Sequence, residues 1–212
     1  MSIIVASNSP PDRLLVGLQR LAAERHKGVV TGEEVSDSDL LVLSRTRPEL
    51  LGVVYERHAP AVYRYLGRRV GVGAAEDLLG DVFVAAVGAR LRVRPHDSGS
   101  ALPWLYGIAG NVVRSYRRRS QGQIPQDQVT AVDWDAVDER LDAGSRRQEL
   151  QVALAELTEA EREVLLLVAW EGLSPAEAAQ ALGLTPVAAR SRLHRARARA
   201  QATLGNMAQA GL

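Results

Sequence analysis

The strongest chemical signal in the sequence is a run of arginines near its C-terminal end. Residues 186–200 contain five arginines and no acidic residue. A guanidinium group can donate two parallel hydrogen bonds to guanine, or it can hold a phosphate oxygen. A solvated basic helix without function is the plain alternative, but it leaves the well-formed turn before this segment unexplained. The segment therefore predicts a helix that binds nucleic acid.

The residues around these arginines predict a helix-turn-helix motif. The first helix would span residues 175–182, Gly183 would supply the turn, and Thr185 with Pro186 would begin the second helix. The spacing i, i+4, i+7 in the second helix predicts an inward-facing stripe of small or apolar residues, which are Ala189, Leu193 and Ala196. The outward-facing residues, which we predict contact DNA, are Arg190, Ser191, Arg192, His194, Arg195 and Arg197.

Residue types elsewhere exclude several classes of chemistry. The chain has no cysteine, which rules out disulfides, thiol catalysis and metal sites that rely on thiolates. Its four histidines are widely spaced, so we expect no histidine metal cluster. Asp77 and Asp81 are the only candidates for an acid–base pair, which is too little for an enzyme that acts on nucleic acid. We expect no catalytic residue, no metal site, no cofactor and no enzymatic activity.

Charge is segregated along the second half of the chain. Arginines gather in residues 114–119 and again in residues 186–200. Between them, residues 121–145 carry six acidic residues against the single Arg140. This order predicts two basic nucleic-acid surfaces joined by a flexible acidic linker over residues 121–147.

Helical periodicity dominates the sequence and no strand pattern is convincing, so we predict an all-α protein. Helices are expected over about residues 51–70, 74–89 and 103–119, with Pro60 starting a new turn and a loop over residues 94–102. The residues expected to face the core in the first two helices are Leu51, Val54, Tyr55, Val62, Tyr63, Leu66, Leu78, Val82, Ala85 and Ala86. Two pairs have the capping-box spacing near the C-terminus, namely Thr158 with Glu161 and Ser174 with Glu177.

These patterns predict two small helical domains. The predicted segments are an N-terminal extension of unknown role (1–36), a first helical domain (37–120), the acidic linker (121–147), a second helical domain (148–205) and a tail (206–212). No stretch approaches the roughly 20 apolar residues that span a bilayer. No basic segment precedes the short apolar run at the N-terminus, so a secretory signal is not expected. We expect a cytoplasmic protein without membrane insertion.

Several segments, taken in order, resemble the extracytoplasmic-function class of bacterial RNA polymerase sigma factors. Residues 55–66 (YERHAPAVYRYL) and 75–83 (AEDLLGDVF) are similar to regions 2.1 and 2.2 of that family. Residues 103–114 (PWLYGIAGNVVR), with the arginines at 117–119, are similar to regions 2.3 and 2.4. Residues 154–165 (LAELTEAEREVL) and the helix-turn-helix resemble region 4. The resemblance implies a sigma factor whose partners are core RNA polymerase and promoter DNA, with an anti-sigma factor left open as a third.

The resemblance also implies roles for particular residues. Region 2.2 docks on the clamp helices of the largest polymerase subunit, and the matching residues, which share one helical face, are Asp77, Gly80, Asp81 and Val84. The family usually has glutamine and glutamate where this chain has Gly80 and Asp81. The loop over residues 94–102 would capture an unstacked base of the minus-ten element. The matching minus-ten residues in the following helix are Asn111 and the phosphate-suited Arg114, Arg117 and Arg118. The acidic linker would thread toward the polymerase's active-site and RNA-exit channels.

Aromatic residues at the start of that helix raise the question of base stacking. Trp104 is expected to pack in the core, whereas Tyr106 is left open between the core and a base. The family often has a basic residue where this chain has Gly110, so one contact to the strand is expected to be missing.

Two other classes share part of these signals. A conventional regulator with a LuxR-like output domain would match residues 157–165 and the helix-turn-helix, but it would also carry an α/β domain, and residues 38–119 show no strand pattern. A protein-interaction scaffold would leave the arginine-rich helix unexplained. We therefore predict a sigma factor that recognises promoter elements and opens promoter DNA.

Overall fold

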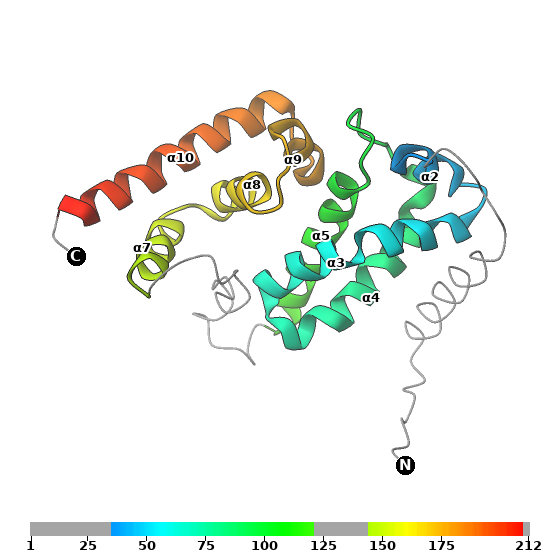
Figure 1. The fold of residues 1–212 in the computed structure, drawn as a ribbon, viewed down its shortest axis with the longest axis horizontal. Coiled ribbons are helices and arrows are strands. Elements are labelled where there is room, and N and C mark those ends of the chain that lie inside the picture. The colour runs from blue at the N-terminus through cyan, green and yellow to red at the C-terminus, as the bar shows by residue number, and fades with distance from the viewer. Residues whose placement is uncertain (1–34, 121–143, 210–212) are drawn as a thin grey trace, which may run out of the picture. The chain divides into compact units, whose positions relative to one another are not determined.

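The computed structural model describes residues 35–120 and 144–209, and both parts are helical (Figure 1). The first range belongs to one compact unit and the second range to another. Neither described part contains a strand, which confirms the predicted all-α fold. Most of the predicted N-terminal extension (1–36), most of the acidic linker (121–147) and the last residues of the tail (206–212) lie outside the described residues. The segment bounds given above stay predictions.

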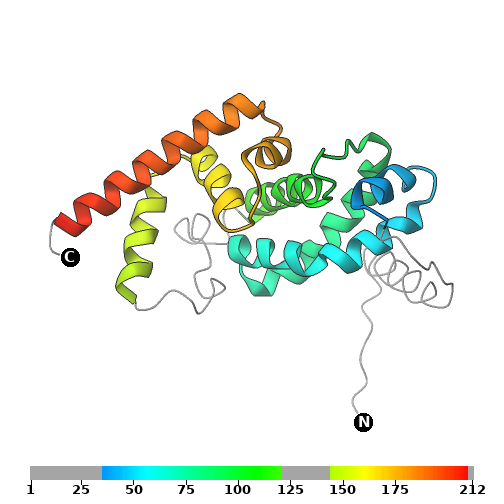
Figure 2. The same ribbon diagram turned by 45° about the horizontal axis from the view of Figure 1, so that its top comes forward.

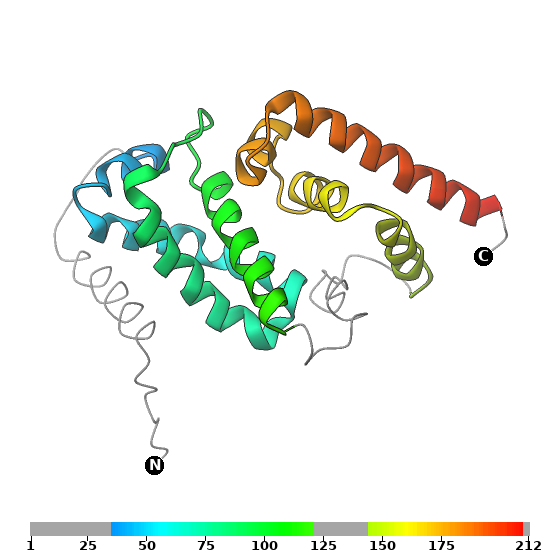
Figure 3. The same cartoon turned by 180° about the vertical axis from the view of Figure 1, so that it is seen from behind.

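Two long helices form the centre of the first unit. Helix α3 (Leu51–Val70) is followed by α4 (Val72–Ala89), and Gly71 alone connects them. Gly71 has a φ of 81°, a left-handed backbone conformation that costs glycine little and lets the chain reverse within one residue. Helix α5 (Leu102–Ser120) packs against both, and Figure 3 shows the three helices side by side.

Short elements complete this unit at the start of α3 and after α4. Helix α2 (Asp37–Leu43) and the 3-10 turn η1 (Pro48–Leu50) precede α3, and η2 (Arg90–Arg92) follows α4. Ser36 caps α2 by accepting a hydrogen bond from the Asp39 N–H. The loop over residues 93–101 then leads into α5, and in Figure 2 this green loop runs beside the blue α2.

The first unit differs from the prediction in the course of α3 and in which side chains reach the core. Pro60 lies inside one continuous helix α3, so the expected new turn is wrong. Tyr65 rather than Tyr63 is buried, with exposed fractions of 1% and 36%. An uninterrupted helix places Tyr65, three residues after Val62, on the same side as Val62, whereas Tyr63 is rotated by about 100°. Ala85 is likewise exposed, while Ala86 is fully buried.

The second unit is built around one long helix. Helix α10 (Pro186–Gln209) packs against α7 (Gly144–Ala155), α8 (Glu159–Ala169) and α9 (Pro175–Leu182). Both predicted capping boxes are present and fix where α8 and α9 begin. The apolar cluster between these helices consists of Leu154, Leu157, Leu166 and Ala196. In neither described part is a helix long and apolar enough to cross a membrane.

Candidate nucleic-acid interface

The predicted helix-turn-helix is present as α9, a tight turn and α10. Gly183 has a φ of 64°, and its N–H donates to the Gln180 carbonyl at 3.1 Å. The Leu184 N–H donates to the Ala179 carbonyl at 2.8 Å. This pair of hydrogen bonds is the Schellman arrangement, which ends α9 and sets the direction in which the chain enters α10.

Helix α10 buries the predicted stripe and exposes most of the predicted DNA contacts. Ala189, Leu193 and Ala196 are at most 3% exposed. The exposed residues among the predicted contacts are Arg190, Ser191, His194, Arg195 and Arg197. Arg192 is only half-buried because it lies three residues after Ala189 and directly before Leu193, at the margin of the buried stripe. The structure therefore centres the exposed face on Ser191 and His194, with Arg192 at its edge.

Sequence reasoning missed an exposed apolar side chain on this face. Val187 lies in the first turn of α10 and is 64% exposed. In a helix it lies one turn before Ser191, on the same side. One signal could have indicated Val187: it falls outside the buried stripe and next to arginines, where a valine contributes nothing to the core.

Glu161 is a second missed residue, because the sequence indicated only its capping role. Its carboxylate is buried, accepts a hydrogen bond from Arg199 Nη1 at 3.0 Å and lies 3.7 Å from Arg195 Nε. Hydrogen bonding from Thr158 and the charges of the two arginines outweigh burial and hold the pKa of Glu161 below its ordinary value. The contribution that the ionised Glu161 makes to the stability of the folded state is thus present at neutral pH and is lost as the pH falls through this lowered pKa. Arg195 and Arg199 therefore help to hold α10 on α8.

The second arginine cluster lies along α5, and its members do different things. Asn111, Arg114 and Arg118 are exposed on one face at i, i+3, i+7. Arg114 Nη2 donates to Asn111 Oδ1 at 2.5 Å. Arg117 is half-buried, and its Nη2 donates to the Arg69 carbonyl at 3.1 Å, which ties α5 to the end of α3. The structure brings three of the four predicted minus-ten residues together and gives Arg117 an internal contact.

The aromatic residues of α5 differ from the expectation. Tyr106 is 3% exposed and stacks on Tyr65 with ring centroids 4.9 Å apart, so it presents no face to a base. Trp104 is half-buried rather than part of the core. A Cβ atom at Gly110 would lie 3.3 Å from the Tyr65 hydroxyl oxygen. The tyrosine stack thus explains why a glycine suits this position, where the family that the sequence resembles often has a basic residue.

The residues predicted to dock on a protein partner lie on α4 with graded exposure. Asp77 is exposed, and Asp81 and Val84 are half-buried. Gly80 is buried and presents little surface. The face is therefore narrower than the sequence pattern predicted, with Asp77 and Asp81 as its polar groups.

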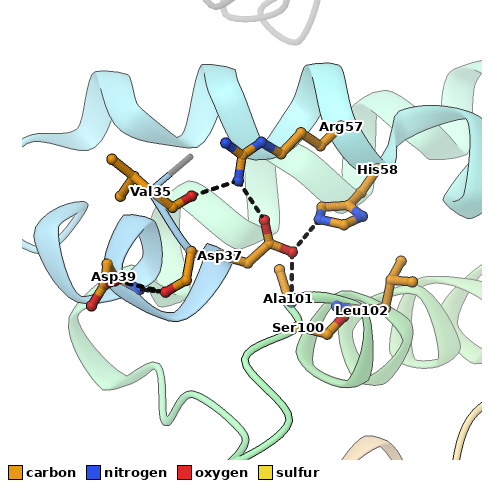
Figure 4. Close-up of polar contacts among 9 residues, drawn as sticks. Val35, Asp37, Asp39, Arg57, His58, Ser100, Ala101 and Leu102 are labelled. Carbon is orange, nitrogen blue, oxygen red and sulfur yellow. Dashed lines mark hydrogen bonds and ion pairs between the residues drawn. The ribbon is translucent and has the colours of Figure 1, made fainter. Parts of the chain in front are cut away.

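A polar cluster around Asp37 was also missed, because its members are far apart in the sequence (Figure 4). Asp37 Oδ1 accepts a hydrogen bond from Arg57 Nη1 at 3.0 Å, and Oδ2 lies 2.5 Å from His58 Nε2. The Ala101 N–H donates to Oδ2 at 3.1 Å, 64 residues along the chain. Burial acts to raise the pKa of Asp37, but hydrogen bonds from Ala101 and Arg57 and the charge of His58 hold that pKa below its ordinary value.

Comparison with known proteins gives consistent matches over both units. Residues 54–123 match the family model for sigma-70 region 2, and residues 147–199 match the model for sigma-70 region 4. The RNA polymerase sigma factor CarQ of Myxococcus xanthus is 35% identical over 157 residues, covering 73% of this chain and 88% of that protein. The ECF RNA polymerase sigma factor SigC of Mycobacterium tuberculosis is 34% identical over 143 residues, covering 64% of this chain and 73% of that protein. The solved structure of CnrH, in complex with the cytosolic domain of CnrY, has a TM-score of 0.55 at 26% identity and covers 81% of this chain and 99% of CnrH.

Proposed function

Because the chain belongs to the extracytoplasmic-function class of RNA polymerase sigma factors, and is thus an alternative sigma factor for transcription initiation, we propose a division of labour among its surfaces. Helix α4 docks on core polymerase, α5 with the preceding loop holds the minus-ten element, and α10 reads the upstream, minus-thirty-five element. The observation that carries this proposal is an exposed, arginine-bearing helix face on each of two compact units, within the matched regions.

The upstream element is read by the first turns of α10. A recognition helix enters the major groove with its N-terminal residues toward the base edges. Arg190 suits a guanine edge, Ser191 can accept or donate, and Val187 offers an apolar contact to a thymine methyl group. Arg197 lies two turns further along the same side as Arg190 and holds phosphate instead.

The minus-ten element is held by the exposed face of α5. Arg114 occupies the Asn111 carbonyl oxygen, which leaves the amide N–H groups free to donate to an extruded base. Arg118 is exposed and suits a phosphate of the separated strand. Arg117 contributes through its internal contact with α3.

The protein partners follow from the same family membership. Asp77 and Asp81 on α4 supply the acidic side chains that dock on the polymerase clamp helices. CnrH was solved with the cytosolic domain of CnrY, and we propose that this chain also binds a further protein besides polymerase, an anti-sigma factor. We propose that the protein acts in the cytoplasm as a regulator of transcription and catalyses no reaction itself.

Run-off transcription tests the docking proposal with a charge reversal on α4. Core polymerase with this chain should start transcripts that core polymerase alone does not, and Asp81→Arg should abolish most of them by weakening polymerase association. Reversing one charge of a complementary pair removes an attraction and adds a repulsion at little cost to the core. Glu76→Arg is the matched control, because Glu76 is exposed on the same helix about 140° away from Asp81. Equal pull-down of core polymerase by Asp81→Arg and the unaltered chain would place the docking face elsewhere.

Asn111→Ala should impair promoter opening more than formation of the closed complex. Because Asn111 is exposed, its truncation leaves the core intact and removes the surface hydrogen bond from Arg114 together with the contact to the captured base. Activity should fall by about fivefold to 150-fold on duplex promoter, as expected for about 1–3 kcal/mol, and recover on a template with a pre-melted bubble. Permanganate footprinting measures the bubble directly. Arg118→Ala is the contrasting variant, since loss of a phosphate contact should weaken both templates alike. Equal losses on both templates for Asn111→Ala would remove its proposed role.

A further inference from the structure

The loop over residues 93–101 is hydrogen-bonded to α2 and to the turn that follows α2. Ser38 donates from its N–H to the Gly99 carbonyl at 3.2 Å and from its Oγ to the His96 carbonyl at 3.4 Å. Arg45 Nη2 donates to the Val93 carbonyl at 2.6 Å, at the other end of the loop. Helix α2 and the turn that follows it thus contact the start, the middle and the end of this loop.

Asp37 joins this arrangement to the rest of the unit (Figure 4). Its carboxylate accepts from the Ala101 N–H, which is the last backbone donor before α5 begins. The same carboxylate contacts Arg57 and His58 in the middle of α3. Its side chain is 11% exposed, so these protein donors replace most of its water. One carboxylate therefore fixes the distance between α2, α3 and the end of the loop.

From these contacts we propose that Asp37 is a positioning residue for promoter recognition, which holds the 93–101 loop in the shape that captures a base of the minus-ten element. The inference rests on the proposed function of that loop and adds to it the residue that sets its conformation. Capturing a base requires the pocket to be formed before the base arrives, since a pocket held loosely loses much of its discrimination. The negative charge also stabilises the start of α5, where the Ala101 N–H donates to it.

The test compares Asp37→Ala with Asp39→Ala in the reconstituted holoenzyme. Asp39 is exposed on the same helix and its variant loses the same charge, but in the part of the chain that the structure describes its carboxylate accepts a hydrogen bond from Ser36 Oγ, three residues away, and none from the loop. Initiation is measured on bubble templates that carry each of the four bases in turn at every non-template position of the minus-ten element. At a single position, Asp37→Ala should bring the ratio of initiation with the preferred base to initiation with the other bases toward one. Its pull-down of core polymerase and its preference in the upstream element should stay unchanged.

Different outcomes would overturn the role of Asp37 and the proposed function of the loop. If the unaltered chain shows no base preference on these templates, the proposed role of the loop fails. If the unaltered chain has a preference and Asp37→Ala keeps it, only the role of Asp37 is overturned, and an equal loss in Asp39→Ala would overturn it as well. Should Asp37→Ala fail to fold, Arg45→Ala decides, because Arg45 is exposed and holds the loop at Val93. A preference that survives Arg45→Ala in full would then refute the inference.

Discussion

Promoter duplex should bind the free chain about 10²–10⁴ times more weakly than it binds the chain assembled with core polymerase. The two arginine-bearing faces lie on separate compact units, so each one alone makes a small, salt-sensitive contact. Polymerase that holds both units would fix the spacing between them, and the second contact would then form as an intramolecular event. The gain in affinity requires no new contact to DNA.

Fluorescence anisotropy at physiological salt, on one promoter duplex with and without core polymerase, measures this difference. The control is a duplex in which the spacing between the two promoter elements is changed by five base pairs. That change should reduce binding to the holoenzyme and leave binding to the free chain unaffected. Nanomolar, sequence-specific binding by the free chain would instead indicate a conventional operator-binding regulator.

Arg190→Ala should change which base the upstream element prefers at one position. A side chain that reads a base edge contributes about 1–3 kcal/mol of discrimination, or about fivefold to 150-fold in relative initiation. Arg190 is exposed one turn into α10, at the end that enters the groove. Its loss should therefore flatten the preference at that position and leave the others intact.

Arg197→Ala is the matched control for this substitution. Arg197 is also exposed and lies seven residues along, on the same side of the helix. It should weaken all sequences alike and reduce the dependence on salt by about one phosphate contact. A saturation library of the upstream element, read by initiation, separates the two patterns. If both variants give the uniform pattern, the reading surface is centred elsewhere, with Ser191 and Val187 as the next residues to change.

Features decided by neighbours in the sequence were predictable, and those decided by packing were not. The capping boxes at Thr158 and Ser174 and the turn at Gly183 depend on residues within five positions of one another, so their spacing indicated them. The Asp37–Ala101 contact joins residues 64 apart, and the Arg199–Glu161 contact joins residues 38 apart. Nothing local to either residue encodes such a pair. Pro60 misled the prediction because a helix held by packing tolerates a proline that propensity alone would place at its start.

The buried stripe of α10 has a consequence for how promoter preference can change among related chains. Ala189, Leu193 and Ala196 carry the contacts that keep the helix in place, while Val187, Arg190 and Ser191 lie away from that stripe. Exposed positions tolerate substitution at little cost to folding, because truncating them opens no cavity. Duplicated copies of such a chain can therefore drift toward different target sequences while the scaffold stays the same. The same separation can be used in engineering. Substitutions at the exposed positions should give sigma factors that each initiate at their own promoters and not at one another's.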